Sequence, residues 1–136
     1  MAHVRKKSRR DTGLFGPFLL TEDSITENVI DRADQWMIGA FALGKIVGGE
    51  MTEDRGRKKF TVQAAGRSDH DIAAALKDYV GQFDAFKFHT YASTRRAFEK
   101  ECQLFHQFKL AEKMDHPAPP ENTKFKCPDA LCPLGD

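Results

Sequence analysis

The sequence lacks any long hydrophobic run. An apolar stretch such as residues 36–43 is far too short to cross a bilayer, which takes about 20 apolar residues in a helix. The start of the chain is charged, and no hydrophobic signal region follows it. We therefore expect a protein with no membrane partner and a cytoplasmic location.

An excess of charge of either sign is missing as well. The chain has 21 basic and 20 acidic residues, for a net charge of +1, so attraction to nucleic acid would have to come from local patches. Residues 5–10, RKKSRR, form one patch, and the second, RGRKK, contains Arg55, Arg57, Lys58 and Lys59. Short basic runs of this kind also occur in disordered ends and at solvated hairpin tips.

Cysteine is scarce, and its number argues against a disulfide framework. Three cysteines cannot all pair, and a cytosolic chain is not normally held by disulfides. Cys102 and His106 lie one turn apart on a predicted helix, so both side chains can reach one ion. With Cys127 and Cys132 they would form a tetrahedral structural zinc site, with His116 as an alternate fourth ligand. The alternative is that Cys102 is a buried small hydrophobe and the other two cysteines are free.

Length and composition indicate one ordinary domain with one core, because 136 residues include 40% hydrophobic residues and eleven phenylalanines. The predicted organisation is a flexible basic tail over residues 1–13, an N-terminal arm over 14–34, an α/β domain over 35–113, and a proline-rich tail over 114–136 that zinc anchors. Thr21 or Ser24 could cap a short helix within the arm.

The periodicity of the central domain predicts its elements. Two apolar segments, residues 36–47 and 58–66, are typical of an antiparallel hairpin. Residues 69–80 have helical spacing behind Ser68, and residues 86–91 alternate as a third strand would. A final helix begins at Thr94, behind the cap residue Ser93, and continues to about Lys113. The expected fold class is therefore α+β (α/β), a small three-stranded antiparallel sheet flanked by helices.

The last helix carries a carboxylate where an apolar residue is expected. Glu101 falls in the middle of the stripe that should face the sheet, which consists of Ala97, Phe98, Leu104, Phe105 and Phe108. Burying a charge is costly unless the charge is paired, hydrogen-bonded or bound to a metal. Glu101 is therefore the best candidate for a functional acid, and the alternative is a buried structural partner for a basic residue reaching from the strands.

The order of these features resembles the GIY-YIG endonuclease family over residues 36–108. The first motif would be Gly39-Ala40-Phe41, and the second Ala64-Ala65-Gly66 followed by Arg67 and Ser68. The family's catalytic glutamate would be Glu101. The resemblance implies cleavage of a phosphodiester bond with one divalent metal, Mg²⁺ or Mn²⁺, held by that glutamate.

The resemblance also implies two motif tyrosines and a helix arginine, and this chain lacks all three at the matching positions. Phe41 lacks the hydroxyl group, Ala64 lacks the whole ring, and residues 73–75 are alanines. Arg67 is the nearest remaining cation. With Ser68 and the helix N-terminus behind it, Arg67 would form a corner that binds phosphate.

Three functions follow as hypotheses. The first is a GIY-YIG-like domain that binds DNA or RNA through Arg67, Ser68, the RGRKK segment and the basic N-terminal arm, with nuclease activity lost or altered. The second is an active metal-dependent nuclease in which Glu101 works with Arg67 or His89. The third is a protein-interaction or structural module that touches no nucleic acid, which the near-neutral charge favours.

Overall fold

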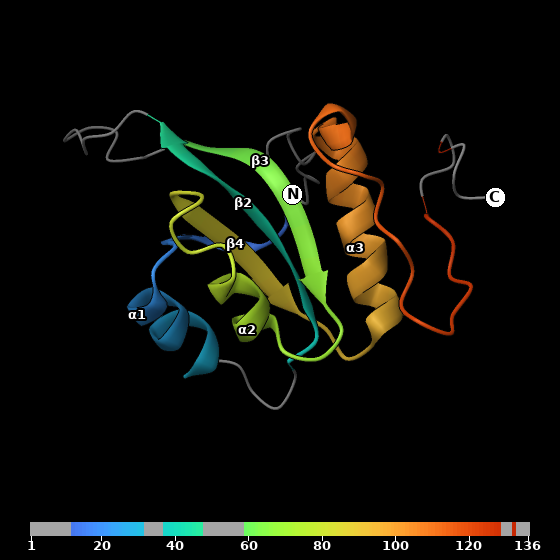
Figure 1. Cartoon of the computed structure of the whole chain (residues 1–136), viewed down its shortest axis with the longest axis horizontal. Coiled ribbons are helices and arrows are strands. Elements are labelled where there is room, and N and C mark those ends of the chain that lie inside the picture. The colour runs from blue at the N-terminus through green and yellow to red at the C-terminus, as the bar shows by residue number, and fades with distance from the viewer. Residues whose placement is uncertain (1–11, 32–36, 48–58, 129–131, 133–136) are drawn as a thin grey trace, which may run out of the picture.

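The computed structural model describes residues 12–31, 37–47, 59–128 and 132 (Figure 1). Its elements are, in order, β1 (Phe15–Leu19), α1 (Glu22–Ile25), the π-helical turn η1 (Thr26–Ile30), β2 (Gly39–Val47), β3 (Lys59–Ser68), α2 (Ile72–Lys77), β4 (Ala85–Thr90), α3 (Thr94–Gln107) and the 3₁₀ turn η2 (Leu110–Glu112). The basic run at residues 5–10 and the predicted nucleic-acid-binding residues Arg55, Arg57 and Lys58 lie outside the described residues.

The four strands form one antiparallel sheet in the order β1-β4-β2-β3. This arrangement confirms the α+β class and corrects the predicted number of strands from three to four. The hairpin of β2 and β3 is the longest pairing, running from Gly39 opposite Ser68 to Val47 opposite Lys59. Within the described residues, no helix is long and apolar enough to span a membrane.

The additional strand is β1, which belongs to the segment predicted as an arm. Its sequence, FGPFL, is interrupted by Gly16 and Pro17, and this interruption hid the strand pattern. Among the described strands it lies at the edge of the sheet, where it pairs with β4 alone. Proline is tolerated at a sheet edge because one side of such a strand needs no ladder hydrogen bonds. Thr21, one of the two predicted caps, then caps α1 and accepts a hydrogen bond from the Ser24 N–H at 3.1 Å.

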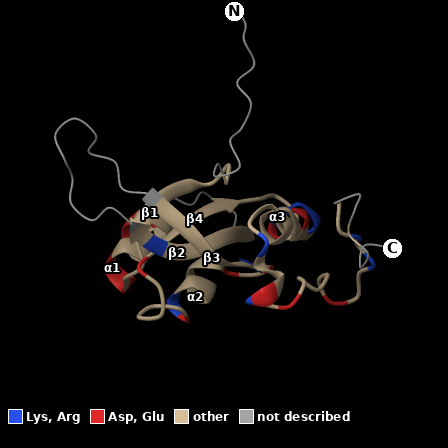
Figure 2. Ribbon diagram, turned by 90° about the horizontal axis from the view of Figure 1, so that it is seen from above, with Lys and Arg blue, Asp and Glu red and all other residues tan. Residues whose placement is uncertain are grey.

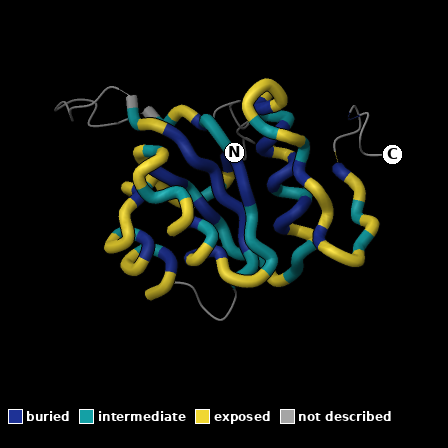
Figure 3. Tube along the Cα trace, viewed as in Figure 1, coloured by how far each residue is buried: buried dark blue, intermediate teal, exposed yellow. Residues whose placement is uncertain are grey.

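Helices cover both faces of the sheet, and alternation along the strands supplies a core to each face. One core, on the face of α1 and α2, contains Phe41, Leu43, Ile72, Leu76 and Phe86. The other, on the face of α3, contains Ala42, Val62, Ala65, Leu104 and Phe105. Figure 2 shows α1 and α2 together on one side of the sheet, and Figure 3 shows the buried central strands and the buried side of α3.

The glycine of the second motif has a packing role. A Cβ atom at Gly66 would lie 2.6 Å from the ring of Phe41, its partner across the hairpin. Only glycine leaves room for this buried ring, so Gly66 is explained by packing without reference to catalysis.

The helix ends differ in detail from the sequence prediction. Ser93 caps α3 as expected, accepting a hydrogen bond from the Arg96 N–H at 3.2 Å. The helix ends earlier than predicted, because Lys109 adopts a left-handed conformation with φ 52°. Helix α2 is also shorter than expected, and Asp71 rather than Ser68 caps it.

Candidate metal centre and the buried acid beside it

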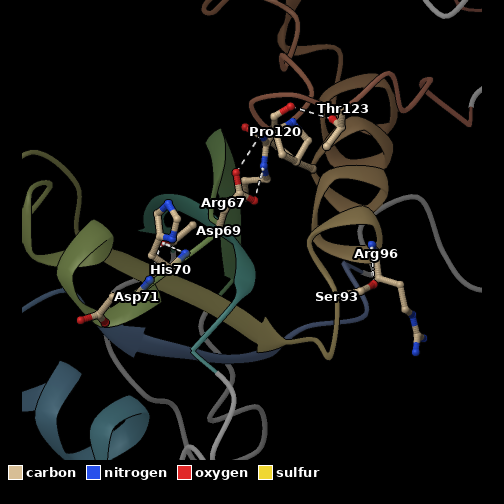
Figure 4. A network of polar contacts seen from close by, with 10 residues as sticks. Arg67, Asp69, His70, Asp71, Ser93, Arg96, Pro120 and Thr123 are labelled. Atoms are coloured by element: carbon tan, nitrogen blue, oxygen red, sulfur yellow. Dashed lines mark hydrogen bonds and ion pairs between the residues drawn. The ribbon is translucent and has the colours of Figure 1, made fainter.

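Glu101 faces the sheet from α3, as its place in the apolar stripe predicts, and it is only 8% exposed. Its partner is Arg67 on β3, whose Nη1 donates to Oε1 of Glu101 at 2.7 Å. The alternative role considered for Glu101, a buried partner for a basic residue from the strands, therefore matches its surroundings. Figure 4 shows Arg67 reaching from the end of β3 among these polar contacts.

The guanidinium of Arg67 is engaged on several sides at once. Its Nε and Nη2 donate to the two carboxylate oxygens of Asp69 at 3.0 and 3.3 Å, and its Cζ lies 5.2 Å from the centre of the Phe98 ring. Burial acts to lower the pKa of Arg67, but Asp69 and Glu101 outweigh this effect and raise it. For Glu101, burial has the opposite effect and raises the pKa of the carboxyl group, and Arg67 opposes that shift only in part.

The predicted phosphate corner is lined by carboxylates of the protein itself. Asp69 takes two donors of the Arg67 fork, and Asp71 caps the first turn of α2 at the Ala74 N–H. The hydroxyl of Ser68 accepts hydrogen bonds from the N–H groups of His70 and Asp71, at 3.2 and 2.8 Å. A phosphate here would meet two negative charges, so the corner is not arranged as an anion site.

Phe41, the residue at the first-motif tyrosine position, is not brought together with Glu101. Its side chain is 2% exposed and packs with Tyr79 in the core under α2, with the ring centres 6.0 Å apart. Arg67 and Glu101 lie on the α3 face instead, because residues 65 and 67 of a strand share one face. The structure therefore splits the predicted catalytic set between the two faces of the sheet. Lys59, the last predicted cation, begins β3.

Four donor side chains gather where the segment after α3 returns along that helix. One ligand atom from each lies within 4.8 Å of the others, and the four residues are His106, His116, Cys127 and Cys132. Figure 1 shows this returning segment running beside α3. Cys127 and Cys132 are 9% and 6% exposed, and both histidines are half-buried. This group can hold a metal ion.

A hydrogen bond to the backbone orients the ring of His116 toward the other three donors. Its Nδ1 lies 2.8 Å from the carbonyl oxygen of Pro117, and a carbonyl oxygen can only accept, so Nδ1 carries the proton. The lone pair of a neutral ring is then on Nε2, which lies 3.3 Å from Sγ of Cys132. Phe105 packs edge-on against the rings of both His106 and His116. Such a second layer fixes the orientation of metal ligands.

The predicted ligand set differs from this group at one position. Cys102 is not among the four donors, and His116, the alternate ligand, is. Cys102 is fully buried against Phe98, Phe125 and Cys127. Burial raises the pKa of its thiol well above the usual range, and Cys127 raises it further. His116 joins the group because the chain turns back after η2 and places His116 over Phe105, beside His106.

Comparison with protein-family models, with curated proteins and with solved structures finds no match to this chain.

Proposed function

We propose that His106, His116, Cys127 and Cys132 hold one structural zinc ion, which fastens the segment after α3 to the helix. The grouping of four donors within 4.8 Å carries this proposal. Two thiolates and two imidazoles are a set typical of tetrahedral zinc, and four protein ligands leave no open position for chemistry. The charge of two thiolates also balances that of a divalent ion in a largely buried place.

Metal analysis of the purified full chain tests the zinc proposal. We expect about one zinc per chain, and we expect Cys127→Ser to lose it. Cys102→Ser is the matched control, since it removes a buried thiol from the same cluster and should keep the metal. Loss of zinc from Cys102→Ser, together with retention in His116→Ala, would restore the set predicted from sequence and refute this one.

We further propose that the chain is a GIY-YIG-like module that binds nucleic acid without cleaving it. The buried ion pair of Glu101 and Arg67 argues against cleavage. A divalent metal at Glu101 would have to displace a guanidinium that donates at 2.7 Å, and the two motif tyrosines are Phe41 and Ala64. Binding of DNA or RNA needs neither the metal nor the tyrosines.

Incubation of labelled DNA and RNA with Mg²⁺ or Mn²⁺ separates binding from cleavage. We expect retention of the nucleic acid with no new products, both for the wild type and for Glu101→Ala. Cleavage by the wild type that Glu101→Ala abolishes would establish the active nuclease instead. Absence of any binding would favour the protein-interaction module.

A further inference from the structure

A groove runs along the solvent side of α3, on the flank that also carries His106. It has a volume of about 690 Å³, and it is lined by Tyr91, Arg96, Glu99, Lys100, Gln103, His106, Gln107 and Pro128. A volume of this size is in the range of small-molecule sites, roughly 300–1,000 Å³. Arg67 and Ser68, which were predicted to contact nucleic acid, do not line this groove.

Four of the lining residues form one stripe of hydrogen-bond donors. Arg96, Lys100, Gln103 and Gln107 follow each other at alternating steps of four, three and four residues, so they lie on one side of the helix. The stripe extends about 16 Å along the axis at 1.5 Å per residue. Cations stand at one end of the stripe and amides at the other.

The groove carries an excess of positive charge. Among the described lining residues the one acid is Glu99, and it pairs at 3.3 Å with Arg95, which lies beside the groove. Arg96 and Lys100 add two positive charges. Figure 4 shows Arg96 extending from the N-terminal end of α3, away from the contacts of Arg67. In contrast to Arg67, Arg96 is exposed, and its guanidinium lies over an aromatic ring.

Aromatic rings adjoin the cationic end. The Arg96 guanidinium lies 5.8 Å from the centre of the Tyr91 ring, and Tyr91 stacks on His89 with centres 4.8 Å apart. His89 stacks in turn on Phe15 of the edge strand, at 4.9 Å. The outermost ring, Phe15, is 59% exposed. This column is held by two strands, so it offers a rigid stacking surface beside the two cations.

We infer that this groove binds a single strand of nucleic acid, with phosphates on Arg96 and Lys100, a base against the aromatic column, and sugar or base edges at Gln103 and Gln107. The inference rests on the proposed nucleic-acid function and moves its site away from Arg67 and Ser68. A single strand fits better than a duplex, because only unpaired bases offer faces to rings and edges to amides.

The metal group forms part of the same groove. His106 is both a donor of the group and a lining residue, and Pro128 follows Cys127 directly. The ion thereby sets the far wall of the groove as well as the path of the segment. Binding of the strand is therefore expected to depend on a metal ion that takes no part in contacting it.

The test is fluorescence anisotropy of labelled single-stranded DNA and RNA oligonucleotides, titrated with the zinc-loaded full chain. Arg96→Gln combined with Lys100→Gln should weaken binding at least tenfold and make the salt dependence shallower by one to two ions, that is, about one per lost phosphate contact. The matched control is Lys45→Ala combined with Lys77→Ala, which removes two exposed cations elsewhere. The control should weaken binding less than threefold.

Several results overturn the inference, and they can be told apart. No binding of either oligonucleotide by zinc-loaded wild type would overturn the proposed function together with the groove. Equal weakening by both double variants would overturn the groove alone. Tighter binding of a poly-glutamate peptide than of the oligonucleotides would assign the groove to acidic protein segments. Shifts of the Tyr91 ring resonances on adding oligonucleotide to wild type would support the site even if the double variant folded poorly, and unchanged resonances would refute it.

Discussion

Two polar clusters on α3 lie less than two helical turns apart, and they differ in whether the protein itself supplies a positive charge. At Glu101, a buried carboxylate receives its cation from the protein, because Arg67 reaches over from β3. At His106, the neighbours are His116 and two cysteines, all of them potential metal donors. The first cluster contains its own positive charge, whereas the second is a group of donors that could hold a metal ion.

The comparison shows why a buried acid on this helix is a weak sign of catalysis. Glu101 has the burial and the raised pKa expected of a functional acid, yet Arg67 and Asp69 account for its surroundings. The cysteine and histidine group instead brings together four potential metal donors. Its donors bring together α3 and a segment without regular secondary structure, so a metal would supply the stability that this segment lacks.

Removal of the metal should produce the largest effect and act on one cluster only. Chelation is expected to free residues 116–128 for hydrogen exchange and to lower the unfolding free energy by several kcal/mol, about 4 kcal/mol where free zinc is 1,000 times the dissociation constant. The sheet and the ion pair of Arg67 and Glu101 should be retained, since the four donors lie outside the strands and take no part in that pair. Identical exchange and melting with and without chelator would contradict the account.

Breaking the internal ion pair should cost less and should not release metal. Glu101→Ala leaves Arg67 buried with Asp69 alone, and we expect a loss of about 3 kcal/mol in urea unfolding. Arg67→Met combined with Glu101→Leu removes both charges, so it should be less destabilised than Glu101→Ala. If the double variant were the less stable one, the pair would contribute more than charge compensation.

A smaller effect is expected at high pH from Tyr91, at the groove. Burial raises its pKa to about 12 from the usual 10, although Arg96 acts to lower it. The unfolded chain thus releases this proton first, so the free energy of unfolding falls as the pH rises from 10 to about 12. Tyr91→Phe should lack this part of the fall, as measured by urea midpoints on both sides of that window. Parallel curves for the two proteins would show that Tyr91 titrates as in the unfolded chain.

The features predicted correctly are those marked in the sequence by a periodic pattern or by a capping residue. Ser93 at the start of α3, the inward position of Glu101 and the pairing of the hairpin strands all follow from spacing and capping. Strand β1 was missed because Gly16 and Pro17 conceal a short edge strand.

Residue spacing alone could not decide whether Cys102 or His116 is the fourth metal ligand. Cys102 and His106 lie one turn apart, and a helical wheel brings both near the same flank. The path of the chain after Lys109 decides whether His116 reaches the returning cysteines, and an irregular segment has no period from which that path could be read. The groove was missed for a related reason, because an exposed polar stripe leaves no hydrophobic pattern.

X-ray absorption at the zinc edge of the purified wild-type chain tests the central claim most directly. Zinc–sulfur and zinc–nitrogen distances differ, at about 2.3 Å and 2.0–2.1 Å, so the first shell can be counted by element. The account predicts two sulfur and two nitrogen ligands. A shell of three sulfurs and one nitrogen would place Cys102 on the metal and contradict it.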